Sequence, residues 1–169
     1  MMDKKRIIFI SYRREDSAYT AGRLYDRLSL HFGSDSVFMD IDTNGLGEDF
    51  VQVIENAVAS CDVLVCIIGK QWLKATSSTG QKRLEDPSDF VRLEIVSALD
   101  LGVDVIPILL DGAEMPNLET LPTVLEPLTR RNGLVISFTR FNADVDQLIR
   151  GIEAIFDTRV VRELQKLSY

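Results

Sequence analysis

Short apolar runs alternate with segments of helical periodicity five times along this chain, and this alternation limits the possible folds more than any other feature of the sequence. The runs are rich in β-branched residues and typical of buried strands, whereas the segments between them repeat apolar residues every three or four positions. Strands that alternate with helices favour a parallel sheet that is covered on both faces. The expected strands are 6–11, 36–40, 62–69, 103–111 and 133–138, and the expected helices are 17–32, 48–61, 88–102, 121–132 and 142–167.

This pattern, in a chain of 169 residues, predicts one α/β domain with a flavodoxin-like, doubly wound sheet of five parallel strands in the order 2-1-3-4-5 and three α/β/α layers. Asp16 or Ser17 is the expected cap of the first helix, and Ser88 is the expected cap of the third. Pro107 lies within the fourth strand, where it suggests an irregularity because proline has no N–H to donate.

Composition excludes several classes of protein. The net charge of −7 argues against nonspecific nucleic-acid binding, which needs a basic surface. No apolar stretch approaches the length of a membrane span, and the N-terminal apolar run is followed by a charged segment rather than by a signal-peptide cleavage site. Cys61 and Cys66 match no zinc or thioredoxin spacing, so we expect two reduced core thiols in a cytoplasmic protein without nucleic-acid or membrane partners.

The sequence lacks the patterns of several common ligand sites. It contains no GxxxxGK[ST] and no GxGxxG after the first strand, which argues against a P-loop or a glycine-turn dinucleotide site. The first strand ends in SYR at 11–13 and the third in GK at 69–70, so the acidic residues of a phosphorelay receiver are missing. The only histidine, His31, is expected on a helix surface, and it supports neither a catalytic triad nor a metal site.

The segment DFVRLEI at 89–95 contains the strongest candidate for a catalytic residue. Phe90 and Glu94 lie one helical turn apart and therefore share a face. Glu94 is either a solvated helix residue, paired with Arg92 or Arg131, or a single carboxylate facing a cleft beyond the carboxyl ends of the strands, where ligands of such sheets bind. A single carboxylate is sufficient for cleaving NAD⁺, because nicotinamide leaves as a neutral molecule and only the sugar cation needs stabilisation.

Four motifs, in this order, resemble a bacterial TIR (Toll/interleukin-1 receptor) domain over about residues 5–156. They are IFISYRREDS (8–17), VFMDIDTNGLGEDF (37–50), CDVLVCIIGKQWL (61–73) and DFVRLEI (89–95). The resemblance implies an NAD⁺ glycohydrolase that forms ADP-ribose or a cyclic isomer, with Glu94 as the essential carboxylate and NAD⁺ as substrate rather than cofactor. Family members often carry Trp-x-x-x-Glu where this chain has Phe90, which keeps the ring but lacks the indole N–H.

The resemblance also implies substrate-binding residues in the strand-one signature, in the loop after strand two at 42–48, after strand three and on the third helix. They are Ser11, Tyr12, Arg13, Asp42, Gly45, Leu46, Trp72 and Phe90. The residues themselves leave other roles open: Tyr12 and Arg13 as caps of the strand end, Asp42 as an Asx-turn residue, and Trp72 as core beneath the polar segment 74–89. The loop lacks the family's usual proline, so we expect it to be more flexible.

The resemblance also implies partners and a biological role. The partners are NAD⁺ and other TIR domains, which assemble into a homo-oligomer or filament on activation, in bacterial immune signalling such as antiphage defence, or in virulence. The alternative is a non-catalytic module that acts only through contacts between TIR domains.

Because the apolar pattern of the last helix continues past its core face, we expect a TIR domain at 1–156 and a helical extension at 157–169 that connects to a further module.

Overall fold

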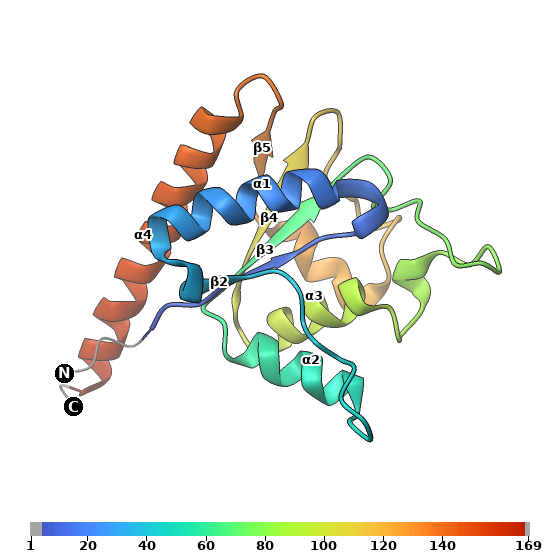
Figure 1. The fold of residues 1–169 in the computed structure, drawn as a ribbon, viewed down its shortest axis with the longest axis horizontal. Helices are drawn as coiled ribbons and strands as arrows, with labels where there is room; N and C mark the ends of the chain where they lie inside the picture. The colour runs from blue at the N-terminus through green and yellow to red at the C-terminus, as the bar shows by residue number, and fades with distance from the viewer. Residues whose placement is uncertain (1–4, 168–169) are drawn as a thin grey trace.

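The computed structural model describes residues 5–167 and contains a five-stranded parallel sheet with the strand order β2-β1-β3-β4-β5 (Figure 1). This result confirms the predicted strand order and fold class. Among residues 5–167, no helix is both long enough and apolar enough to cross a membrane. The strands are β1 (Ile8–Ser11), β2 (Val37–Phe38), β3 (Val63–Ile68), β4 (Asp104–Leu110) and β5 (Leu134–Ile136).

Helices cover both faces of the sheet, as Figure 1 shows. One apolar core lies between the sheet and the pair α1 and α4, and a second lies between the sheet and the elements α2, α3 and η3. Successive residues of β3 enter the two cores alternately, which explains why this strand is apolar at every position. The helices are α1 (Arg14–Phe32), α2 (Phe50–Ala59), α3 (Phe90–Asp100) and α4 (Phe141–Leu167), with 3-10 turns η1 (Ser34–Ser36), η2 (Arg83–Glu85) and η3 (Thr123–Arg130).

The predicted cap of α1 is wrong. The helix begins at Arg14, its backbone is non-helical at Ser17, and Arg13 precedes it without a side-chain cap. Asp16 instead accepts a hydrogen bond from the backbone N–H of Gln71 (3.0 Å), and its carboxylate lies against Gly69 in a space that a side chain would fill. The Asp16 carboxylate therefore contacts the end of β3 instead of capping the helix.

The predicted cap of α3 is also wrong. Asp89, not Ser88, precedes the helix and accepts a hydrogen bond from the N–H of Arg92 (3.1 Å). The hydroxyl of Ser88 donates to Asp86 (2.7 Å) in the turn before it. The start of α3, the helix that carries Glu94, therefore depends on a residue with contacts outside the helix.

Two details of the sheet differ from the prediction. Strand β2 contains two residues rather than five, because the chain leaves the sheet after Phe38. Pro107 causes no break, since the β3–β4 register is continuous from Val63↔Asp104 to Ile68↔Leu109. Pairing of β4 with β5 begins only at Ile108, so Pro107 occupies a position where β4 is still an edge and no N–H is needed.

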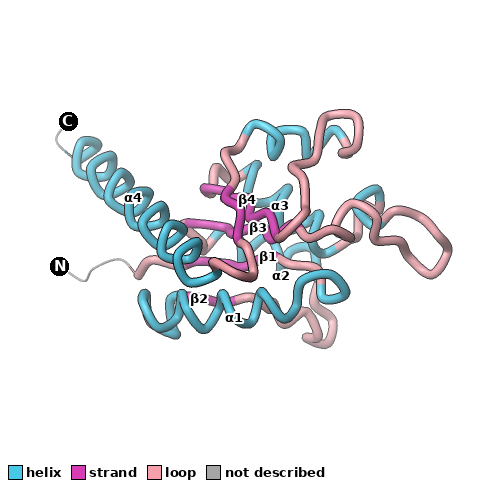
Figure 2. Tube along the Cα trace, turned by 90° about the horizontal axis from the view of Figure 1, so that it is seen from above, coloured by secondary structure: helices cyan, strands magenta, loops and turns pink. Residues whose placement is uncertain are grey.

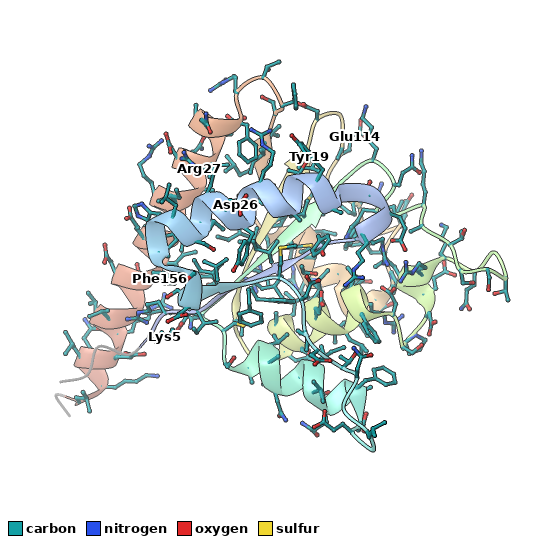
Figure 3. The ribbon with its side chains drawn as sticks, viewed as in Figure 1. Lys5, Tyr19, Asp26, Arg27, Glu114 and Phe156 are labelled. Carbon is teal, nitrogen blue, oxygen red and sulfur yellow. The ribbon has the colours of Figure 1, made fainter. Side chains whose placement is uncertain are left out.

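Helix α4 packs against the sheet over most of its length and then continues beyond it (Figure 2). Its last large buried residue is Phe156, which Figure 3 labels. One turn later, the Arg159 guanidinium donates to Asp104 (2.9 Å) and to the buried Asp62 (3.4 Å). Residues 160–167 are exposed. We therefore propose that the packed domain ends at Arg159; the limit expected from periodicity is residue 156.

We expect deletion of residues 160–169 to change the melting temperature little and deletion of 157–169 to lower it by several degrees. The longer deletion removes Arg159 from the buried Asp62, and a loss of about 1 kcal/mol lowers the melting temperature of a domain of this size by about 2–4 °C. Thermal unfolding of both truncations, with Arg159→Met in the full chain as a control, tests this boundary. Equal melting temperatures for the two truncations would place the limit of the domain elsewhere.

Candidate active site

A cavity of about 400 Å³ lies beyond the carboxyl ends of β1 and β2, next to the start of α3. This volume is within the range of small-molecule sites, and the position is where α/β sheets bind their ligands. This is the end of the sheet at which the sequence predicts a ligand. It is lined by Tyr12, Arg13, Arg14, Glu15, Met39, Asp40, Ile41, Thr43, Asn44, Ile54, Arg83, Phe90, Val91 and Glu94.

Glu94 lies in the wall of this cavity, on the same face of α3 as Phe90. Its Oε2 accepts a hydrogen bond of 2.6 Å from the hydroxyl of Ser11, the last residue of β1. Arg92, one of the partners considered from the sequence, instead donates to the backbone carbonyl of Leu84 (3.0 Å). Glu94 thus contacts a neutral donor at the end of a strand rather than a surface arginine.

Burial raises the pKa of Glu94 from 4.5 to about 8. The hydrogen bond from Ser11 opposes this increase because it favours the charged form, and so does the nearby guanidinium of Arg13. The carboxylates of Asp89 and Asp40 act in the other direction and raise the pKa further. A carboxyl group with a pKa displaced this far, in a cavity wall, is typical of a functional site.

Arg13 and Asp89 form a buried ion pair that joins the end of β1 to the start of α3. The two guanidinium nitrogens Nη1 and Nη2 donate to the two carboxylate oxygens at 2.9 and 2.8 Å, and the Arg13 side chain is 1% exposed. Arg83, from the polar segment before α3, approaches the same carboxylate at 3.3 Å and also pairs with Glu15 at 3.0 Å. Arg13 therefore has a structural partner in addition to its place in the cavity wall.

The cavity contains more than one carboxylate, so the expectation of a single acidic residue is wrong. Asp40 accepts a hydrogen bond from the Tyr12 hydroxyl (3.0 Å) and lies 3.5 Å from the Arg14 guanidinium. Burial and the hydrogen bond to Asp40 raise the pKa of the Tyr12 hydroxyl. Asp40 and Glu15 each face an arginine, whereas Glu94 faces a serine.

Sequence reasoning missed four charged residues of the cavity. Arg14, Glu15 and Asp40 lie shortly after β1 and β2, and only their charge distinguished them from their neighbours. Arg83 comes from the polar segment 74–89, which carried no local signal for a position at the cavity. Phe90 is at the cavity as expected; the residue is 43% exposed, and its ring packs against Phe50 with 5.4 Å between the ring centroids.

Five of the predicted substrate-binding residues do not line the cavity in this structure: Ser11, Asp42, Gly45, Leu46 and Trp72. Trp72 is 0% exposed and belongs to the core on the α2 and α3 side of the sheet. Asp42 forms the Asx turn considered from the sequence, accepting from the N–H of Asn44 at 3.0 Å. Gly45 and Leu46 lie farther along the same loop, where the Leu46 side chain is fully exposed. The cavity is instead lined from this loop by Ile41, Thr43 and Asn44.

The remaining sequence candidates have structural roles. His31 lies on the surface of α1 and pairs with Glu153 of α4 at 2.7 Å. Cys61 and Cys66 are buried free thiols, as expected, and burial raises the pKa of both. Within residues 5–167, no group of three or more His, Cys, Asp or Glu side chains is arranged to hold a metal ion.

Comparisons with known proteins agree with the fold. The protein NAD(+) hydrolase sarm1 of Drosophila melanogaster is 28% identical over 149 residues, which are 88% of this chain and 10% of that protein, so this chain spans about a tenth of that relative's length. The TIR domains of the activated Roq1 resistosome superpose with a TM-score of 0.61 at 15% identity, covering 87% of this chain and 99% of theirs.

A prokaryotic SEFIR domain has the same fold, with a TM-score of 0.54 at 18% identity over 86% of this chain and 96% of its own. At these identities, the two solved structures show the fold alone. The family model described as TIR domain matches residues 8–149, which include every strand of the sheet and the whole lining of the cavity. The chain therefore belongs to the TIR domain family.

Proposed function

We propose that this TIR domain cleaves NAD⁺ at the bond between nicotinamide and ribose, releasing nicotinamide and ADP-ribose or a cyclic isomer. The observation that carries the proposal is Glu94, a half-buried carboxyl group in the wall of a cavity of about 400 Å³, which accepts a hydrogen bond from Ser11 and forms no ion pair within residues 5–167. The sequence similarity to a protein named as an NAD(+) hydrolase supports the same reaction.

The chemistry requires little more than one carboxylate. When the glycosidic C–N bond breaks, its electron pair stays on the nicotinamide nitrogen, so the leaving group is neutral and needs no general acid. The ribose becomes an oxocarbenium-like cation, which the Glu94 carboxylate in the cavity wall stabilises electrostatically. Water then adds to the anomeric carbon and loses a proton, giving ADP-ribose; attack by an adenine nitrogen gives a cyclic isomer instead.

The displaced pKa of Glu94 is consistent with a cationic substrate. A carboxylate that is expensive to desolvate gains more from an adjacent positive charge than a carboxylate in water does. The pyridinium ring of bound NAD⁺ would favour the charged form of Glu94 and thus lower its pKa below the value of about 8 in the free protein. Substrate binding and formation of the reactive carboxylate are therefore coupled in this proposal.

The other groups of the cavity suit the rest of the substrate. Arg14 and Arg83 both line the cavity and present guanidinium groups able to bind the two phosphates of NAD⁺. The partly exposed ring of Phe90 offers a surface for stacking against a planar base. The Asp40 carboxylate is able to accept hydrogen bonds from ribose hydroxyls, and the Tyr12 hydroxyl is able to donate to them or accept from them.

We expect nicotinamide release to increase more steeply than linearly with protein concentration. The loop at 42–48 lies beside the cavity and carries the exposed Leu46, so its ordering costs entropy that a neighbouring TIR domain would offset. Release of nicotinamide from NAD⁺ is measured over a hundredfold range of protein concentration, together with the molar mass in solution. Constant specific activity from a monomer throughout would contradict activation by assembly.

The alternative function is a non-catalytic interaction module, which the exposed Leu46 and the missing indole at Phe90 favour. The same experiment separates the two functions. Absence of nicotinamide release at every concentration, and also after fusion to an oligomerising partner, would contradict the enzymatic function and support the module.

A further inference from the structure

Ser11 lies behind Glu94, not against the cavity. It is the last residue of β1, pairs in the sheet with Cys66 of β3, and is 1% exposed. Its hydroxyl donates to Oε2 of Glu94 at 2.6 Å, although the two residues are 83 positions apart in sequence. One carboxylate oxygen is thus held from the sheet side, while Glu94 itself contributes to the cavity wall.

A second contact keeps this hydrogen bond aligned. Arg13, two residues after Ser11, binds Asp89, five residues before Glu94, through two buried hydrogen bonds. Asp89 also caps the first turn of α3 by accepting from the N–H of Arg92. The end of β1 and the start of α3 are therefore joined at two points, and the position of the Glu94 carboxylate relative to the sheet is determined by both.

We propose that Ser11 is the positioning residue of Glu94: its hydroxyl orients the carboxyl group toward the cavity and does not contact the substrate. This inference rests on the proposed function for its role in the reaction, but its physical basis is the buried hydrogen bond itself. It assigns Ser11 a place behind the reacting group, in contrast to the substrate contact that family resemblance suggests.

Substitution of Ser11 has a predictable effect on the titration of Glu94. The charged or titratable groups that act on Glu94 are Asp89 on the turn before α3, Arg13 after β1 and Asp40 after β2, and the Cys66 thiol of β3 also interacts with it. Ser11→Ala leaves all of these in place and removes only the neutral donor that favours the charged carboxylate. The pKa of Glu94 should therefore move further upward, by about one unit for a buried hydrogen bond to a charged group.

The first measurement is an NMR titration of the glutamate side-chain carboxyl carbons in the full chain, with the Glu94 signal assigned from its loss in Glu94→Gln. We expect the midpoint of Glu94 to lie about one pH unit higher in Ser11→Ala than in the parent, and to return toward the parent value in Ser11→Thr, which retains the hydroxyl. Ser97→Ala is the matched control. It also removes a buried serine hydroxyl, but this one lies on α3, one turn beyond Glu94.

The second measurement is kcat/KM against pH, which reports the ionisation of the free protein. With Glu94 active as the carboxylate, Ser11→Ala should be about tenfold slower than the parent at pH 7 and should recover as the pH rises above 9. An unchanged titration midpoint in folded Ser11→Ala would overturn the inference. A shifted midpoint in a protein that releases no nicotinamide under any condition would retain the role of Ser11 and refute the proposed function.

Discussion

Glu94→Gln is expected to lower NAD⁺ cleavage by about 100-fold or more, the size of effect seen when one preorganised electrostatic group is removed from an active site. The amide is nearly the same shape as the carboxyl group, and its oxygen is still able to accept the hydrogen bond from Ser11. What the variant loses is the negative charge that stabilises the ribose cation. Nicotinamide release, measured at the protein concentration of greatest parent activity, tests this prediction.

The same substitution is expected to raise stability at alkaline pH. The pKa of Glu94 is about 8 in the folded protein and 4.5 ordinarily, so between these values the folded state holds a proton that the unfolded state has lost. The contribution of Glu94 to the free energy of unfolding is therefore complete below pH 4.5 and is lost as the pH rises through 8. The whole loss corresponds to about 3–5 kcal/mol for this pKa shift. Glutamine has no charge to desolvate, so its variant avoids that loss.

Thermal unfolding at pH 5 and pH 9 measures this effect. The parent and Glu94→Gln should unfold at similar temperatures at pH 5, and the variant should unfold at a higher temperature at pH 9. Glu55→Gln, at an exposed position of α2, is the matched control and should alter neither activity nor the pH dependence. Turnover close to that of the parent in a folded Glu94→Gln protein would refute the catalytic role of Glu94.

Breaking the buried pair between Arg13 and Asp89 should cause the largest loss of stability. Arg13→Met leaves a buried carboxylate that keeps its cap to the Arg92 N–H and the longer ion pair with Arg83, and Asp89→Leu leaves a buried guanidinium and an uncapped helix. Removal of one member of a buried pair typically costs about 3–5 kcal/mol, because the remaining charge stays desolvated. We expect each single variant to lose this amount in the free energy of unfolding.

The double variant Arg13→Met with Asp89→Leu distinguishes a buried charge from a general loss of packing. It leaves no unpaired charge, so its loss should be clearly smaller than the sum of the two single losses. Urea unfolding of the four proteins gives the coupling between the two positions. Arg14→Met, at an exposed arginine next in the chain, should change stability by less than about 0.5 kcal/mol. Additive losses would mean that the two side chains stabilise the fold independently.

The sequence by itself determined the strand order, the two-sided burial of the sheet and the pairing of Phe90 with Glu94 on one helix face. The last two follow from local periodicity: a strand covered on both faces is apolar at every position, and residues four apart on a helix lie side by side. The alternation of strands and helices then leaves few possible topologies. The length of β2 and both helix caps were wrong, because those boundaries depend on contacts made elsewhere in the chain.

Only the tertiary structure decided what surrounds Glu94. The hydroxyl of Ser11 reaches the carboxylate across 83 residues, and Arg13 selects Asp89 across 76, and neither pairing leaves a periodic trace in the sequence. Trp72, whose position after a strand was compatible with either the cleft or the core, lies in the core. The burial of a residue, the pKa of a carboxyl group and the partner of an arginine all depend on which elements pack around them. They are properties of the packed chain and not of the neighbouring residues in the sequence.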